Sequence, residues 1–276
     1  MSAARPSADA SGASLPEALA PFLEDPARTA ILLDVDGTLA PIVRHPDDAV
    51  VPETTRARIN ALAKRYGVVA CVSGRAASDA RRLVGIGSIT YIGNHGGEIL
   101  HHGGGKPEID PELGHWIRRV QDFKQGVTTP QLHRERVRLE DKGTIVAFHW
   151  RGAPNEAAAE DSVREIAESA EEAGFQAHWG RKVLEVRPPV EMHKGVGVAR
   201  LVRDADLTGA IYIGDDTTDL DAFGTLRELV ENGRLERSLS VGVRADEGPP
   251  EVVAEADIVV DGVEGVRDVL AQLDAH

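Results

Sequence analysis

Two aspartates at the end of a short apolar run constrain this chain more than any other feature. Residues 30–33 are apolar and lead into Asp34 and Asp36, after which Gly37 begins a turn. Such a run is typical of a strand buried on both faces of a parallel sheet, and these sheets bind ligands beyond the carboxyl ends of their strands. Side chains spaced by two on an extended chain point the same way. Both carboxylates can therefore face one ligand.

Adjacent carboxylates repel each other, so the pair Asp34 and Asp36 suggests a divalent cation or a shared proton. An Asp-Gly sequence after a strand also commonly forms nothing more than a turn. A second acidic segment favours the metal site over the simple turn. Residues 210–213 form another apolar run that leads into Gly214 and Asp215, with further aspartates at 216, 219 and 221. The spacing does not match an EF-hand, because the required glycine and glutamate are missing.

Groups suited to binding phosphate lie between the two acidic segments. A third apolar run, residues 68–72, ends in Ser73, Gly74 and Arg75, which offer a hydroxyl donor and a close backbone approach. Lys194 begins a predicted helix, where unpaired N–H groups and the helix dipole favour an anion. Each segment alone is typical of an exposed surface. Their order relative to the acidic segments favours a phosphate site.

Composition excludes several classes of partner. The chain has 276 residues and a net charge of −14, which argues against nucleic acid and against anionic membranes. The single cysteine, Cys71, allows no internal disulfide, so we predict a reducing compartment and a cytoplasmic protein. No stretch reaches the roughly 20 apolar residues of a membrane span. The opening residues lack the apolar core of a signal peptide, and we predict a disordered or loosely packed tail over residues 1–26.

Short apolar runs alternate with helical patterns along most of the chain. This rhythm predicts an α/β fold with a doubly wound parallel sheet. A glycine cluster at 103–105 interrupts the rhythm, so we predict a core domain of residues 27–103 and 188–276 with an insert at 104–187. Within the insert we expect helices at 112–123 and 156–173, and strand pairs at 137–140 with 144–150 and at 175–179 with 182–186. These elements predict a small α/β sandwich.

Four segments, taken in order, resemble the motifs of the haloacid dehalogenase superfamily of phosphotransferases: Asp34-Val-Asp-Gly-Thr38, Ser73, Lys194 and Gly214-Asp-Asp216. Residues 93–98, 140–143, 149–151, 183–188 and 214–223 narrow the resemblance to trehalose-6-phosphate phosphatases. It runs from about Ala30 to near the C-terminus. It implies a Rossmann-like haloacid dehalogenase core with the insert as an α/β cap over the active site.

The resemblance also implies a mechanism, namely Mg²⁺-dependent hydrolysis of trehalose 6-phosphate through an aspartyl-phosphate, in trehalose biosynthesis. Asp34 is expected to attack phosphorus, and Asp36 to act first as acid and then as base. Mg²⁺ is expected to be held by Asp34, Asp215 and the backbone carbonyl of Asp36. The expected phosphate-binding residues are Gly37, Thr38, Ser73, Gly74 and Lys194. Arg75, Asp216 and Asp219 are expected to support these groups.

By the same resemblance, polar residues would hydrogen-bond the sugar. They are Asn94 and His95 between core and cap, and Glu140, Arg151, Arg181, Lys182 and Glu185 in the cap. We also predict a monomer, a sugar phosphate as substrate, and a functional link to a trehalose-phosphate synthase.

Several alternatives stay open at this point. A phosphatase of sucrose phosphate or of glucosyl- or mannosyl-glycerate phosphate would share the catalytic residues, as would a phosphohexomutase of the superfamily. A nucleotide-sugar transferase that uses Asp34 and Asp36 as a metal-binding pair would leave Ser73, Lys194 and Asp215 without a role. A receiver module phosphorylated on Asp34 would have no use for Asp36 or for the insert.

Overall fold

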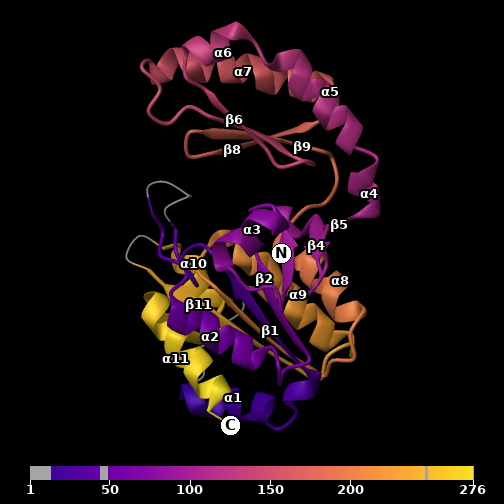
Figure 1. Ribbon diagram of the computed structural model, residues 1–276, viewed down its shortest axis with the longest axis vertical. Coiled ribbons are helices and arrows are strands. Elements are labelled where there is room, and N and C mark those ends of the chain that lie inside the picture. The colour runs from indigo at the N-terminus through magenta and orange to yellow at the C-terminus, as the bar shows by residue number, and fades with distance from the viewer. Residues whose placement is uncertain (1–13, 44–48, 246–247, 276) are drawn as a thin grey trace, which may run out of the picture. The chain divides into compact units, whose positions relative to one another are not determined.

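A computed structural model describes residues 14–43, 49–245 and 248–275 in two compact units (Figure 1). The first unit comprises the described residues up to Glu108 and from His193 onward, and the second is Ile109–Met192. The predicted insert was 104–187, so the second unit begins and ends about five residues later than that segment. Within the described ranges, no helix combines the length and the apolar character that crossing a bilayer requires.

The first unit is built on an eight-stranded sheet in the order β12-β11-β10-β1-β2-β3-β4-β5. The strands from β12 to β3 run parallel, and β4 pairs antiparallel with β3. The strands are β1 (Thr29–Asp34), β2 (Val68–Val72), β3 (Thr90–Gly93), β4 (Glu98–Leu100), β5 (Glu108–Ile109), β10 (Gly209–Gly214), β11 (Arg237–Arg244) and β12 (Ile258–Asp261).

Helices pack on both faces of this sheet (Figure 1). The helices are α1 (Leu15–Leu23), α2 (Glu53–Leu62), α3 (Ala77–Val84), α8 (Lys194–Arg203), α9 (Thr217–Glu231), α10 (Pro250–Glu255) and α11 (Gly262–Asp274). Ile31 and Leu33 of β1 belong to the apolar cluster that includes α1, α2, α3 and α11. Ala30 and Leu32 belong to the cluster on the opposite face, with α8, α9 and α10. This alternation buries β1 on both sides and confirms the predicted doubly wound parallel sheet.

The N-terminal prediction was wrong for part of its range. Residues 15–23, predicted to be disordered or loosely packed, form α1, and Leu19 and Phe22 are buried in the core beside α11. Three apolar residues spaced by four and three, Leu15, Leu19 and Phe22, place one face of this short helix on the core. Residues 1–13 of the predicted tail lie outside the described residues.

The second unit packs three of its four helices against a four-stranded antiparallel sheet in the order β6-β7-β9-β8. Its elements are α4 (Pro111–Gly114), α5 (Ile117–Val127), α6 (Pro130–Arg134), β6 (Arg138–Asp141), β7 (Val146–His149), α7 (Glu156–Glu172), β8 (Gln176–Gly180) and β9 (Val183–Arg187). The single helix expected at 112–123 is instead two helices, because the chain turns at His115 and Trp116. Alternate sheet residues such as Phe148, Leu184 and Val186 are buried in a cluster with α5, α6 and α7.

Candidate active site

The strand register brings the two acidic segments and the serine segment to one edge of the sheet. Leu33 of β1 pairs with Ile213 of β10 on one side and with Cys71 of β2 on the other. The residues that follow, Asp34, Asp215 and Ser73, therefore leave the carboxyl ends of three adjacent parallel strands. All three side chains are buried. This edge is where open α/β sheets bind ligands.

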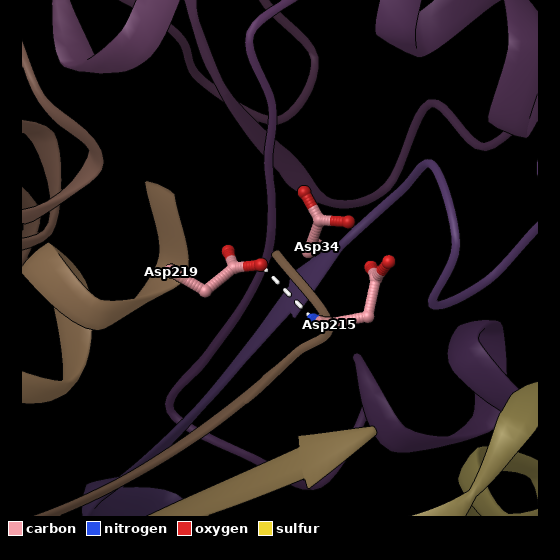
Figure 2. A group of neighbouring side chains, drawn as sticks. All are labelled: Asp34, Asp215 and Asp219. Carbon is pink, nitrogen blue, oxygen red and sulfur yellow. Dashed lines mark hydrogen bonds between the residues drawn. The ribbon is translucent and has the colours of Figure 1, made fainter. Parts of the chain in front are cut away.

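Three buried aspartates meet at this edge. Asp34, Asp215 and Asp219 each place a carboxylate oxygen within 4.8 Å of the others (Figure 2). The oxygens of Asp219 are already engaged. Its Oδ1 accepts hydrogen bonds from Lys194 Nζ (2.7 Å) and Tyr212 Oη (2.6 Å), and its Oδ2 accepts from the backbone N–H groups of Asp215 (3.0 Å) and Asp216 (2.9 Å). Asp34 and Asp215 are consequently the pair best placed to hold a cation.

Burial makes the ionised forms of these two carboxyls costly. It raises the pKa of Asp34 well above the ordinary range, and the negative charges of Asp219 and Asp215 add to the rise while Lys194 opposes it. Burial likewise raises the pKa of Asp215 to about 6, although Thr38 Oγ1 donates a hydrogen bond to its Oδ1 (2.9 Å). A bound cation would stabilise both ionised groups. The donor set, hard carboxylate oxygens, fits Mg²⁺.

Lys194 supplies the positive charge beside the candidate nucleophile. It is the first residue of α8, and its Nζ lies 2.6 Å from Asp34 Oδ1 and 2.7 Å from Asp219 Oδ1. Burial disfavours the ammonium, but the charges of Asp34 and Asp219 outweigh that cost and raise the pKa of Lys194. The ammonium therefore stays charged at neutral pH.

The glycine turn after β1 fits closely against Asp215. Gly37 has φ +95°, and a Cβ added there would lie 2.0 Å from Asp215 Oδ2, so any other residue would strain the turn and displace the Asp215 carboxylate. One predicted phosphate contact is not available in this structure, because the N–H of Gly37 donates to the carbonyl of Ala40 (2.7 Å). The Thr38 hydroxyl is likewise engaged with Asp215, which leaves only the backbone of Thr38 for an anion.

Arg75 contacts the second aspartate of the pair directly. Its Nε and Nη2 donate to Asp36 Oδ2 and Oδ1, each at 2.7 Å. The Arg75 N–H donates to Ser73 Oγ (3.1 Å), which leaves the hydroxyl hydrogen of Ser73 to donate elsewhere. One residue thus connects the acidic turn after β1 with the serine loop after β2.

Asn94 and His95, predicted to contact sugar, lie against the serine loop. Both have left-handed backbones, with φ of 50° and 53°, which non-glycine residues adopt at an energetic cost. Their N–H groups donate to Arg75 O (2.8 Å) and Ser73 O (3.3 Å). A Cβ on Gly74 would lie 2.7 Å from the His95 ring. The strained segment therefore fixes the loop that carries Ser73.

The predicted supporting residue Asp216 is exposed and caps α9. Its Oδ1 accepts from the N–H of Thr217 (2.6 Å), while Asp219 occupies the third helical position and completes a capping box. Asp219, not Asp216, is the aspartate that contacts Lys194.

Two of the predicted sugar contacts in the second unit lie on adjacent strands of its sheet. Glu140 of β6 and Glu185 of β9 both pair with Ala147 of β7, so they share the face opposite the helices. Lys142 Nζ (2.8 Å) and Arg187 Nη2 (2.5 Å) donate to Glu185. Burial alone would raise the pKa of Glu185, but these two cations lower it to about 2.

The same face carries residues that the sequence analysis did not select. His149 Nε2 lies 2.8 Å from Glu140 Oε2, and Lys142 and Arg187 flank Glu185. The two-residue spacing of 140 with 142 and of 185 with 187 is the signal that could have found Lys142 and Arg187.

The other predicted sugar contacts do not join this group. Arg151 is exposed and donates to the backbone oxygen of Arg181 (3.2 Å). Lys182 has φ +62° and pairs with Glu156 at the start of α7, on the helical side of the sheet.

Comparison with known proteins decides the family. The model of the trehalose-phosphatase family matches residues 32–256. The chain belongs to the trehalose-phosphatase family. It is 32% identical over 225 residues to the probable trehalose-phosphate phosphatase G of Arabidopsis thaliana, covering 73% of this chain and 59% of that protein. It is 30% identical over 251 residues to a probable trehalose-phosphate phosphatase of Sinorhizobium fredii, covering 88% and 87% of the two chains.

The chain spans only about three-fifths of the length of the plant relatives, 59% and 61% in two of them. Among solved structures, the C-terminal domain of trehalose-6-phosphate phosphatase from C. albicans superposes with a TM-score of 0.69 at 22% identity, covering 95% of this chain and 97% of that one. A haloacid dehalogenase-like hydrolase from Bacteroides thetaiotaomicron also shares the fold, with a TM-score of 0.60 at 13% identity over 88% of this chain and 98% of that one.

Proposed function

We propose that this chain hydrolyses trehalose 6-phosphate to trehalose and inorganic phosphate. The observation that carries the proposal is the buried contact of 2.6 Å between Lys194 and Asp34, with Asp215 beside it, in a member of the trehalose-phosphatase family. A carboxylate beside a fixed cation is suited to attack an anionic phosphate.

Mg²⁺ is the cofactor that the donor set favours. Asp34, Asp215 and the backbone carbonyl of Asp36 would hold the ion. Burial raises the pKa values of Asp34 and Asp215, which supports this assignment because a bound cation would stabilise both ionised carboxylates. When bound, the ion neutralises charge on the phosphoryl oxygens, which lets an anionic nucleophile approach.

The chain's own groups divide the reaction into two displacements. An oxygen of Asp34 forms a bond to phosphorus as the bond from phosphorus to the sugar oxygen breaks, and Asp36 gives its proton to that oxygen. Water then forms a bond to phosphorus as the aspartyl-phosphate bond breaks, and Asp36 takes the proton that the water loses. Ser73, the backbone at Gly74, the N–H of Thr38 and the ammonium of Lys194 bind the remaining phosphoryl oxygens.

Recognition of the sugar is assigned to the second unit and to the Asn94-His95 segment. The polar face that carries Glu140 and Glu185 supports this assignment, because two carboxylates held by neighbouring side chains offer fixed acceptors to sugar hydroxyls. Arg151, Arg181 and Lys182 stay predictions from the family resemblance, as does the link to a synthase.

Phosphate release from a panel of sugar phosphates tests the proposal. Trehalose 6-phosphate should be turned over in preference to sucrose phosphate, glucosyl-glycerate phosphate and hexose phosphates, and chelation of Mg²⁺ should abolish release. Asp34→Asn should be inactive. Equal turnover of hexose phosphates with none of trehalose 6-phosphate would contradict the proposed substrate but not the phosphatase reaction. Full activity of Asp34→Asn would contradict the proposed mechanism. Production of an isomerised sugar phosphate would indicate a mutase.

A further inference from the structure

Tyr212 lies in the centre of the sheet and yet reaches the polar cluster. It is a fully buried residue of β10, and its ring packs edge-on against Phe223 with centroids 5.8 Å apart. The ring belongs to the apolar cluster between the sheet and the helices α8 and α9. Only its hydroxyl contacts a charged group, Asp219 Oδ1, at 2.6 Å.

The hydrogen bond between Tyr212 and Asp219 runs in one direction. Asp219 Oδ1 also accepts from the Lys194 ammonium and its Oδ2 accepts from two backbone N–H groups, so the carboxylate acts as an acceptor throughout and the tyrosine donates. Burial raises the pKa of Tyr212, and the negative charges of Asp219 and Asp34 add to that rise. Tyr212 therefore stays a hydroxyl donor throughout the working pH range.

Lys194 is shared between two carboxylates at nearly equal distances. Its Nζ lies 2.6 Å from Asp34 Oδ1 and 2.7 Å from Asp219 Oδ1, and each oxygen competes for the same positive charge. Asp219 receives three further donors, the Tyr212 hydroxyl and the N–H groups of Asp215 and Asp216. Each donor reduces the negative potential that Asp219 exerts on Lys194. The tyrosine acts on the same oxygen as Lys194, so its effect is the most direct.

We propose that Tyr212 is a positioning residue that limits the attraction of Asp219 for Lys194 and so keeps the ammonium on Asp34 and the phosphoryl group. This inference rests on the proposed phosphatase function for its kinetic consequence, but the placement of Lys194 can be measured without turnover. Tyr212 contacts neither substrate nor metal in this scheme and acts only through Asp219.

Tyr212→Phe is the test, and Tyr91→Phe is its matched control. Tyr91 is also a fully buried residue of the same sheet, and its hydroxyl donates a hydrogen bond of the same length, 2.6 Å, to a backbone carbonyl, that of Ile86. Both variants lose one buried hydroxyl, so both should lose stability to a similar degree. Only Tyr212→Phe should change the site.

We expect Tyr212→Phe to lower kcat about tenfold and to weaken binding of inorganic phosphate severalfold, while KM changes less than kcat. The ¹⁵N resonance of the Lys194 side chain, assigned with Lys194→Arg, should shift in Tyr212→Phe and stay in place in Tyr91→Phe. A kcat within twofold of the unsubstituted protein, or equal losses in the two variants, would overturn the inference, as would an unmoved Lys194 resonance.

Two further arms keep the outcomes distinct. If the unsubstituted protein releases no phosphate from any sugar phosphate, the proposed function fails, and the Lys194 resonance alone then decides the role of Tyr212. If Tyr212→Phe does not fold, replacement of the three tyrosines by 3-fluorotyrosine keeps the rings and strengthens hydroxyl donation. Because donation to Asp219 becomes stronger, the Lys194 resonance should then shift in the direction opposite to the shift that removal of the hydroxyl would cause. An unchanged resonance would overturn the inference.

Discussion

The guanidinium of Arg75 holds both carboxylate oxygens of Asp36 through two hydrogen bonds of 2.7 Å. Such a two-point contact fixes the plane of the carboxylate as well as its position. The proposed proton carrier is therefore oriented before a substrate arrives.

We expect Arg75→Lys to lower kcat by about tenfold, because a single ammonium cannot reproduce the two-point contact. Unfolding should become easier by less than about 1 kcal/mol, since the pair is partly exposed, at 22% for Arg75 and 40% for Asp36. Steady-state kinetics and denaturant unfolding measure the two effects. Arg82→Lys is the control, because Arg82 is an exposed arginine that pairs with Asp79 on α3. Equal kcat values in the two variants would contradict the orienting role.

A second prediction concerns the turn after β1. Gly37→Ala should abolish Mg²⁺ binding, because the new Cβ would lie 2.0 Å from Asp215 Oδ2 and displace that carboxylate. Gly103→Ala is the matched control, since Gly103 also has a left-handed backbone but no atom lies within 4 Å of its added Cβ. Backbone strain should lower the free energy of unfolding of both variants, by an amount of the order of 1 kcal/mol. Calorimetric titration with Mg²⁺ distinguishes the two variants, because only Gly37→Ala should lose metal binding. Normal metal affinity in Gly37→Ala would contradict the assignment of Asp215 as a metal ligand.

A third prediction concerns pH. The folded chain without metal holds a proton on Asp215 up to about pH 6, whereas the unfolded chain releases it near pH 4. Between these values the folded state binds more protons, so the free energy of unfolding should fall as pH rises. The loss should be of the order of 3 kcal/mol from this group and complete above pH 6.

Denaturant unfolding in EDTA, from pH 4 to 7, measures this effect as the difference between the unsubstituted protein and Asp215→Asn. Mg²⁺ should reduce the fall, because it stabilises the ionised carboxylates and must displace their protons to bind. A difference that stays constant across the range would show that Asp215 titrates normally.

A fourth prediction concerns the second unit. Glu185→Gln should raise KM for trehalose 6-phosphate severalfold and leave KM for p-nitrophenyl phosphate nearly unchanged, since the latter has no sugar hydroxyls. Glutamine keeps a hydrogen-bonding group beside Lys142 and Arg187, which limits the loss of stability. Glu160→Gln on α7, paired with Arg164 on the helical side, is the control. An unchanged KM for the disaccharide phosphate would exclude Glu185 from sugar binding.

Sequence reasoning located the features that depend on local order. Asp34, Ser73 and Asp215 each follow an apolar run, and parallel strands bring their carboxyl ends together whatever the distance along the chain. The same logic predicted β1, β2 and β10 to within a residue. The short helix α1 was missed because its burial depends on packing with α11, more than 200 residues away.

Contacts fixed only by the folded backbone were beyond sequence reasoning. In the sequence, Tyr212 is one residue of an apolar strand, and nothing indicates that its hydroxyl contacts Asp219. The contact arises because α9 begins shortly after β10 and its first turn places Asp219 beside that hydroxyl. Asp216 and Asp219 looked equivalent by sequence, yet one caps the helix in solvent and the other is completely buried under Lys194. The hydrogen bond from the Gly37 N–H to the carbonyl of Ala40 likewise depends on the conformation of the turn.

The position of β1 between β2 and β10 has a consequence for synthesis of the protein. The ribosome completes β1 and β2 before β10, which emerges about 180 residues after Asp34, and this spacing corresponds to roughly 10–40 seconds of translation. For that interval the nascent chain carries a central apolar strand with one unpaired edge, which is a template for association with other chains. We therefore expect chaperone capacity during translation to limit the yield of this protein more than the stability of its finished fold.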